Sequence, residues 1–127
     1  MKIILVDAVD TFVIKGKGIF QEMYELLKKY PHKKIILTNA NDNQIIEFGS
    51  INLPYPLFTL KNNPNKTDQN YFRIMLKNFN LTPEEVIYFE QDINAVKSAE
   101  SVGIKSYPYN ASKKDLIALK EFLDENL

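Results

Sequence analysis

Polar side chains that could hold a phosphate or a cation follow four apolar runs of this sequence. In chain order they are Asp7 and Asp10, Thr38 and Asn39, Lys61 and Lys66, and Glu90, Gln91 and Asp92. Carboxylate oxygens are ligands that Mg²⁺ prefers, and a hydroxyl or an ammonium can donate hydrogen bonds to phosphate. If these side chains meet in space, they can bind a phosphate together with a divalent cation. Loops are also polar for solvation alone, so the interpretation depends on the fold that holds them.

Five short runs of apolar or β-branched residues are typical of strands buried on both faces of a parallel sheet. These runs are Ile3–Val6, Ile35–Thr38, Leu57–Leu60, Val86–Phe89 and Ile104–Tyr107. Between the runs, apolar residues recur at helical spacing, and these stripes predict helices. The stripes consist of Ile19, Phe20, Met23, Leu26 and Leu27; of Phe72, Met75, Leu76 and Phe79; and of Leu116, Leu119 and Leu123.

Strands that alternate with helices predict a doubly wound, Rossmann-like α/β domain of three layers with a five-stranded parallel sheet. Right-handed crossovers place the loops after the strands along one edge of that sheet. The four polar groups therefore lie along one edge, which is where such folds bind ligands. We expect one domain over residues 1–127, since this length and a hydrophobic content of 45% suffice for a single core.

The composition argues against several classes of function. Sixteen basic residues balance sixteen acidic ones, so no overall field attracts nucleic acid or an anionic membrane, and neither is expected as a partner. The absence of cysteine excludes disulfides, thiolate metal sites and cysteine nucleophiles. Asp7 ends the N-terminal apolar run too early for a signal peptide, and no later run could span a bilayer. We therefore expect a cytoplasmic protein.

The order of the motifs resembles the haloacid dehalogenase-like (HAD) superfamily of phosphohydrolases. The segment IILVDAVDT matches an apolar strand followed by Asp-x-Asp-x-Thr at Asp7 and Thr11, and IILTN matches a strand that ends at Thr38. NKTDQNYF matches a lysine that opens a helix at Lys66, and VIYFEQDINAVKSAESVG resembles a strand ending in an acidic pair, followed by a helix that closes on glycine. The resemblance extends over residues 2 to about 107. Lys61 is the competing lysine, but its spacing to the last motif fits the family less well.

The resemblance implies roles for these residues. Asp7 would attack phosphorus and form an aspartyl-phosphate, with Thr38 and Lys66 as the other catalytic residues. Thr38, Asn39 and Lys66 would bind the substrate phosphate, and Mg²⁺ would be held by Asp7 with Gln91 and Asp92. The family fold is the same α/β core, and the short intervals between the motifs leave no room for a cap domain.

Two positions depart from the family pattern. Val9 stands where the family has the Asp that protonates the leaving group and then activates water, and valine can do neither. Asp10 is one residue too late for that role, so we expect it to bond nearby backbone amides in the tight loop instead.

Gln91 stands at the position of the metal-ligating Asp, and Ala95 at the later acidic position, so any Mg²⁺ should bind weakly. Glu90 or Asp92 could compensate as a ligand, or Asp92 could simply interact with the N-terminus of the following helix.

Two functions of different classes follow from these matches and departures. The first is a weak or vestigial Mg²⁺-dependent phosphohydrolase acting through Asp7 on a phosphorylated substrate. The alternative is a catalytically inactive HAD-like domain that acts in binding or assembly with a protein partner. A dehalogenase fits less well, because the one arginine, Arg73, lies in a helical stripe region.

Overall fold

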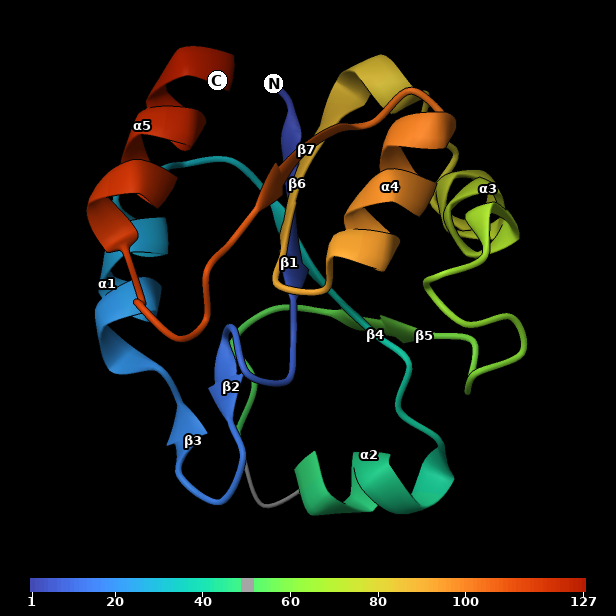
Figure 1. The fold of residues 1–127 in the computed structure, drawn as a ribbon, viewed down its shortest axis with the longest axis horizontal. Coiled ribbons are helices and arrows are strands. Elements are labelled where there is room, and N and C mark those ends of the chain that lie inside the picture. Colours follow the sequence, from blue (N-terminus) through green and yellow to red (C-terminus); the bar gives the residue numbers. More distant parts are fainter. Residues whose placement is uncertain (49–51) are drawn as a thin grey trace.

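A five-stranded parallel sheet forms the centre of the computed structural model, which describes residues 1–48 and 52–127. The strand order is β5-β4-β1-β6-β7 (Figure 1). The strands are β1 (Ile3–Asp7), β4 (Lys34–Thr38), β5 (Leu57–Thr59), β6 (Val86–Glu90) and β7 (Lys105–Pro108). β1 lies at the centre and pairs with β4 on one side and β6 on the other. The predicted sheet is confirmed, with every strand within a residue or two of its expected bounds.

Helices cover both faces of the sheet and complete the three layers (Figure 1). One face carries α1 (Gln21–Lys28) and α5 (Leu116–Asn126), and the other carries α3 (Gln69–Asn78) and α4 (Ile93–Ser101). Each face has its own hydrophobic core. Val6 belongs to the core under α1 and α5, whereas its neighbour Leu5 belongs to the core under α3 and α4. This division follows from the pleat, because successive side chains of a strand point to opposite faces.

The apolar stripes that predicted the helices pack into these two cores. Met23 and Leu27 of α1 and Leu119 of α5 contribute to one core, and Met75 of α3 to the other. Ile19 does not belong to the helical stripe. It lies in β3 (Gly18–Ile19), and α1 begins only at Gln21. The helix N-terminus was therefore predicted slightly too early.

Two small elements at the carboxyl edge of the sheet were not predicted. β2 (Val13–Ile14) and β3 form an antiparallel hairpin directly after β1, and α2 (Asp42–Phe48) follows β4. Strands of two residues carry no alternation that a sequence pattern could reveal. The hairpin turn instead depends on Gly16 and Gly18, whose φ angles of +78° and +85° favour glycine. A single 3₁₀ turn, Pro83–Glu85, leads into β6.

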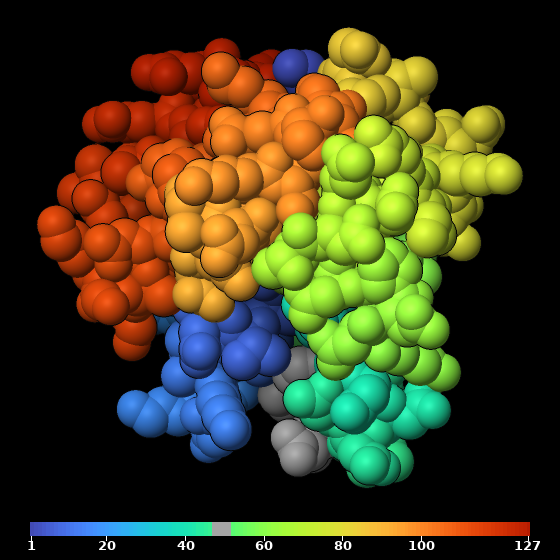
Figure 2. All heavy atoms as spheres, turned by 45° about the vertical axis from the view of Figure 1, so that its right-hand side comes forward, coloured from blue at the N-terminus to red at the C-terminus, as the bar shows by residue number. Residues whose placement is uncertain are grey.

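The hairpin and α2 extend beyond the body of the molecule as two separate projections (Figure 2). Both lie at the edge where β1 and β4 end (Figure 1). Apart from them, the two described ranges hold the sheet, its covering helices and short connections, with no cap domain. Within the same ranges, every helix is too short or too polar to cross a membrane.

Candidate active site

A cavity of about 360 Å³ opens at the carboxyl ends of β1, β4 and β6. The hairpin and α2 flank it, since Ile14 and Gln44 are among its lining residues. All the site residues expected from the sequence also line it, namely Asp7, Thr38, Asn39, Lys66, Gln91 and Asp92. The fold therefore brings together side chains that are up to 85 positions apart, from residue 7 to residue 92, as the crossover argument predicted.

A buried lysine joins two carboxylates at the base of this cavity. Lys66 Nζ donates to Asp7 Oδ1 at 2.7 Å, to Glu90 Oε1 at 2.6 Å and to the carbonyl oxygen of Leu37 at 3.2 Å. The side chains of Lys66, Asp7 and Glu90 are only 6%, 5% and 2% exposed. An ammonium has three protons, so this arrangement uses all of them. Asp7 and Lys66 therefore lie in direct contact at the base of the cavity, and their roles toward a phosphate stay predictions.

The position of Lys66 is fixed by contacts on both sides of it. Its backbone N–H donates to Asn39 Oδ1 at 2.8 Å, so Asn39 holds the lysine segment against the loop after β4. Two residues later, Asp68 caps α3 by accepting from the N–H of Asn70 at 2.9 Å. Because α3 begins at Gln69, Lys66 lies just before the helix instead of in its first turn. Its predicted contact with substrate, and that of Asn39, stays a prediction.

Asp7 is oriented by donors on its second oxygen as well. Thr11 Oγ1 donates to Asp7 Oδ2 at 2.7 Å, and the backbone N–H of Gln91 approaches the same oxygen at 3.4 Å. Thr11 matches the first motif in the sequence, but the motif match gives it no role in the site. Its signal was the four-residue spacing from Asp7, which the tight loop turns into a direct contact.

Thr38 lies at the end of β4 with its hydroxyl in the cavity wall. Thr38 Oγ1 accepts from the backbone N–H of Ala40 at 3.2 Å. A hydroxyl can accept and donate at once, so its own proton stays available for a phosphate oxygen. The carbonyl oxygen of Thr38 accepts from the Tyr71 hydroxyl at 2.9 Å, which ties α3 to β4 directly beside the site.

Glu90 is the main site residue that the sequence did not assign, although it was considered as a possible metal ligand. Burial raises the pKa of Glu90 to about 8, and the negative charge of Asp7 adds to this effect while Lys66 opposes it. The Tyr88 hydroxyl donates to Glu90 Oε1. Burial also raises the pKa of Tyr88, which keeps it a neutral donor. A carboxylate as the last residue of the apolar run VIYFE was the available signal.

The charge of Lys66 depends on its two partners. Burial alone would lower the pKa of Lys66, but the charges of Asp7 and Glu90 outweigh burial and hold it above its usual value. The site therefore contains a permanent cation within hydrogen-bond distance of Asp7. Such a cation can neutralise part of the charge of a bound phosphate.

The residues around Asp7 fit a Mg²⁺ ion poorly. Within the described part of the chain, no group of three or more Asp, Glu, His or Cys side chains is arranged to hold a metal. Asp92 Oδ1 caps α4 by accepting from the N–H of Asn94 at 2.9 Å. Glu90 Oε2 accepts from the N–H of Asp92 at 3.1 Å, while its other oxygen is bonded to Lys66. The metal site of Asp7, Gln91 and Asp92 stays a prediction.

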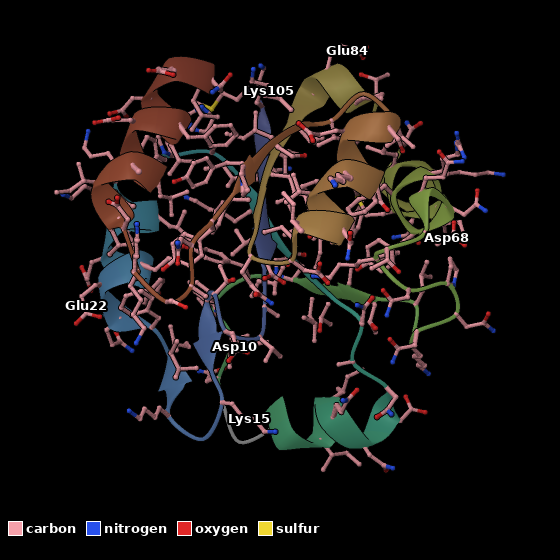
Figure 3. All side chains as sticks on the ribbon, viewed as in Figure 1. Asp10, Lys15, Glu22, Asp68, Glu84 and Lys105 are labelled. Atoms are coloured by element: carbon pink, nitrogen blue, oxygen red, sulfur yellow. The ribbon has the colours of Figure 1, made fainter. Side chains whose placement is uncertain are left out.

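The loop after β1 presents a valine to the cavity. Val9 lines the cavity and is 36% exposed. Asp10 has a φ angle of +65°, and its N–H donates to the carbonyl of Val13 at 2.8 Å, so the tight loop is present (Figure 3), while the expected bonds of the Asp10 side chain to backbone amides stay a prediction. Asp and Asn tolerate this left-handed conformation better than most residues do.

A scan against protein-family models finds no match to this sequence, and a search of curated proteins finds no relative. Comparison with solved structures does find similar folds. A HAD family enzyme from Bacteroides thetaiotaomicron, in complex with magnesium and inorganic phosphate, has a TM-score of 0.60 at 18% identity. The match covers 74% of this chain and 54% of that enzyme.

Two further structures support the same fold. The core domain of a proposed phosphoglycolate phosphatase from Streptococcus pneumoniae TIGR4 has a TM-score of 0.66 at 14% identity, covering 98% of this chain and 96% of that one. A haloacid dehalogenase-like protein of unknown function from Agrobacterium tumefaciens has a TM-score of 0.62 at 14% identity. The match covers 84% of this chain and 62% of that protein. The chain therefore has the fold of the HAD core, and it spans about half the length of the Bacteroides enzyme.

Proposed function

We propose that this chain transfers phosphoryl groups to Asp7 and is a weak or vestigial phosphohydrolase. The observation that carries the proposal is the 2.7 Å bond between Lys66 Nζ and Asp7 Oδ1 at the base of a cavity. In this proposal the Asp7 carboxylate attacks phosphorus, the Thr38 hydroxyl donates to a phosphate oxygen, and Lys66 neutralises charge. Thr11 and the Gln91 N–H hold the carboxylate in position.

Magnesium would assist such a reaction by neutralising the phosphate when it is bound. The similar Bacteroides enzyme was solved with magnesium and inorganic phosphate. Here the neutral Gln91 and the helix-capping Asp92 support only weak binding of the ion. We therefore expect phosphate release to respond to Mg²⁺ only at high concentrations of the ion.

The second candidate function is a HAD-like domain that binds a phosphorylated ligand or a protein partner without turnover. It is favoured by Val9, because an apolar side chain replaces the proton-transfer group next to a retained Asp7 and Lys66. Under this alternative the cavity would bind phosphate, but Asp7 would not become phosphorylated.

A phosphate-release assay with and without Mg²⁺ distinguishes the two functions. Wild type, Asp7→Asn and Asp10→Asn are incubated with a panel of aryl and alkyl phosphates. Asp10→Asn is the matched control, since it is the same chemical change three positions later and Asn also tolerates its φ of +65°. We expect Asp7→Asn alone to abolish release. Equal rates in all three proteins would refute the proposed function, and no release with measurable phosphate binding would favour the second.

A further inference from the structure

The cavity lacks a group that is free to transfer a proton to or from a substrate. Its ionisable lining residues within the described ranges are Asp7, Lys15, Lys66, Glu90 and Asp92. All three protons of Lys66 are donated to fixed acceptors. Glu90 keeps a proton at neutral pH because its pKa is raised, but its side chain is only 2% exposed, and Lys66, Tyr88 and the N–H of Asp92 engage both of its oxygens. That proton therefore stays within the buried cluster and is not free to reach a leaving group. Asp92 caps α4. Lys15 is exposed on the hairpin, and an ammonium is a poor acid near neutral pH.

This lack has different consequences for different phosphates. An alkyl phosphate expels an alkoxide, which needs a proton as the bond to phosphorus breaks. An acyl phosphate expels a carboxylate, which is stable as an anion and needs no proton. A site without an acid therefore discriminates between the two classes by the chemistry of the leaving group.

We infer that the phosphoryl donors of this site are acyl phosphates, and that the phosphorylated Asp7 persists because no base activates water against it. The inference rests on the proposed function. In the transfer step, an oxygen of the Asp7 carboxylate forms a bond to phosphorus. The bond between phosphorus and the acyl oxygen breaks, and its electron pair leaves with the carboxylate product. No proton is gained or lost, so Val9 is no obstacle to this half of the reaction.

The cavity also suits the two ends of such a substrate. Asp7, Thr38 and Lys66 lie at its base, whereas Val9, Val13 and Ile14 form an apolar part of its lining that can contact the acyl group. Lys15 extends from the hairpin toward α2 (Figure 3). Its ammonium can stabilise the departing carboxylate. A volume of about 360 Å³ accommodates a small acyl group.

The second half of a phosphatase cycle has the opposite requirement. Water that attacks the aspartyl-phosphate must lose a proton, and general base assistance typically contributes about 10²–10⁴-fold. Without that assistance, phosphorylation by an acyl phosphate outpaces hydrolysis. The phosphorylated form then accumulates, and the protein serves as a phosphoryl acceptor with slow turnover.

The test compares two donors of nearly equal size, benzoyl phosphate and benzyl phosphate. The protein is incubated with each, and phosphorylation is followed by intact mass and by peptide mapping of Asp7. We expect benzoyl phosphate to add one phosphoryl group at Asp7, and benzyl phosphate to add none. Asp7→Asn should accept none from either donor.

Val9→Asp and its matched control Val9→Asn then address persistence. Val9→Asp should shorten the lifetime of the phosphorylated form by about 10²–10⁴-fold. Val9→Asn should not, because asparagine has the shape of aspartate but cannot act as a base. In case Val9→Asp does not fold, the lifetime of the phosphoryl group on wild type is measured by intact mass after the donor is removed. The donor class has a second test in wild type with substituted phenyl phosphates, whose phosphorylation rate should rise steeply with the acidity of the leaving phenol.

The outcomes separate this inference from the function on which it rests. Equal phosphorylation by benzyl and benzoyl phosphate, or a rate independent of the leaving phenol, would overturn the donor class while leaving phosphoryl transfer at Asp7 intact. Rapid loss of the phosphoryl group from wild type would overturn persistence alone. Absence of both phosphorylation and phosphate release with every donor would refute the proposed function itself.

Discussion

Lys66 holds the candidate site together at the scale of single residues. Its ammonium lies between the carboxylates of Asp7 and Glu90, and all three side chains are buried. Buried charges are stable only when they are paired, so removing the cation leaves the Asp7 carboxylate without compensation, and above about pH 8 the Glu90 carboxylate as well. The same residue therefore supports the fold and would neutralise phosphate in the proposed reaction.

Replacing this lysine should destabilise the protein strongly. We expect Lys66→Met to lower the free energy of unfolding by about 3–5 kcal/mol, the cost typical of breaking a buried ion pair. Above about pH 8, where Glu90 is ionised, adding Glu90→Gln should recover part of the loss, because one of the two unpaired carboxylates is removed. Urea denaturation of the single and double variants measures both effects.

Lys61→Met is the control for this comparison. Lys61 pairs with Asp42 at 2.9 Å, but the two side chains are 56% and 75% exposed. Exposed pairs contribute about 0–1 kcal/mol, so this variant should unfold close to wild type. Similar losses in Lys61→Met and Lys66→Met would contradict the assigned burial of the site.

Glu90 should make stability depend on pH. Its pKa is raised from 4.5 to about 8 in the folded protein, so the folded state holds a proton that the unfolded chain releases. The contribution of this group is fully present below pH 4.5 and is lost as the pH rises to about 8. The unfolding free energy of wild type minus that of Glu90→Gln should therefore fall as the pH rises over this range. Urea denaturation at intervals from pH 5 to 8 tests this, and a difference that stays constant or grows would be inconsistent with it.

The elements that could be predicted from the sequence are those with a long pattern. All five sheet strands were found because a strand buried on both faces is a continuous apolar run, as IILVD and VIYFE are. The hairpin and α2 were missed because two-residue strands and a seven-residue helix show too little periodicity. The pairing of Lys66 with Glu90 was missed for another reason. It depends on how two loops meet, which no local pattern records.

At the scale of elements, Asp92 caps α4. Since its side chain accepts from Asn94 N–H, Asp92→Ala should cost about 0.5–2 kcal/mol of stability, as N-cap losses do. Mg²⁺ binding by calorimetry should be unchanged. Asp115→Ala is the matched control, because Asp115 caps α5 in the same way and is not among the residues lining the cavity. A loss of Mg²⁺ binding in Asp92→Ala alone would instead identify Asp92 as a ligand.

The whole molecule has the fold of the HAD core at low sequence identity to the solved structures. Identities of 14–18% to the solved HAD structures accompany TM-scores of 0.60–0.66. Such a fold depends on the apolar runs and on right-handed crossovers, which tolerate extensive substitution. The proposed site depends on single polar residues at strand ends. Val9 and Gln91 can therefore alter function without disturbing the sheet.

The last prediction concerns these two positions, which lie far apart in the chain and line the same cavity. Val9→Asp supplies the missing proton-transfer group and should raise the hydrolysis of aryl phosphates, by up to about 10²–10⁴-fold where the other groups are competent. Gln91→Asp supplies a hard anionic ligand and should tighten Mg²⁺ binding in calorimetry. Because both changes act on one transition state, the double variant should gain more than either single change alone.

Val9→Asn with Gln91→Asn is the control for the double variant, since it matches the shape of the new side chains without their charge. Asp7→Asn in the active background should abolish the gain, because the proposed nucleophile is then absent. The double variant could fold, bind Mg²⁺ and still release no phosphate from a broad panel. In that case the lack of a proton-transfer group and of a metal ligand does not explain the inactivity of Asp7 as a nucleophile. The buried Asp7–Lys66 pair would then serve ligand binding or stability, as the second candidate function requires.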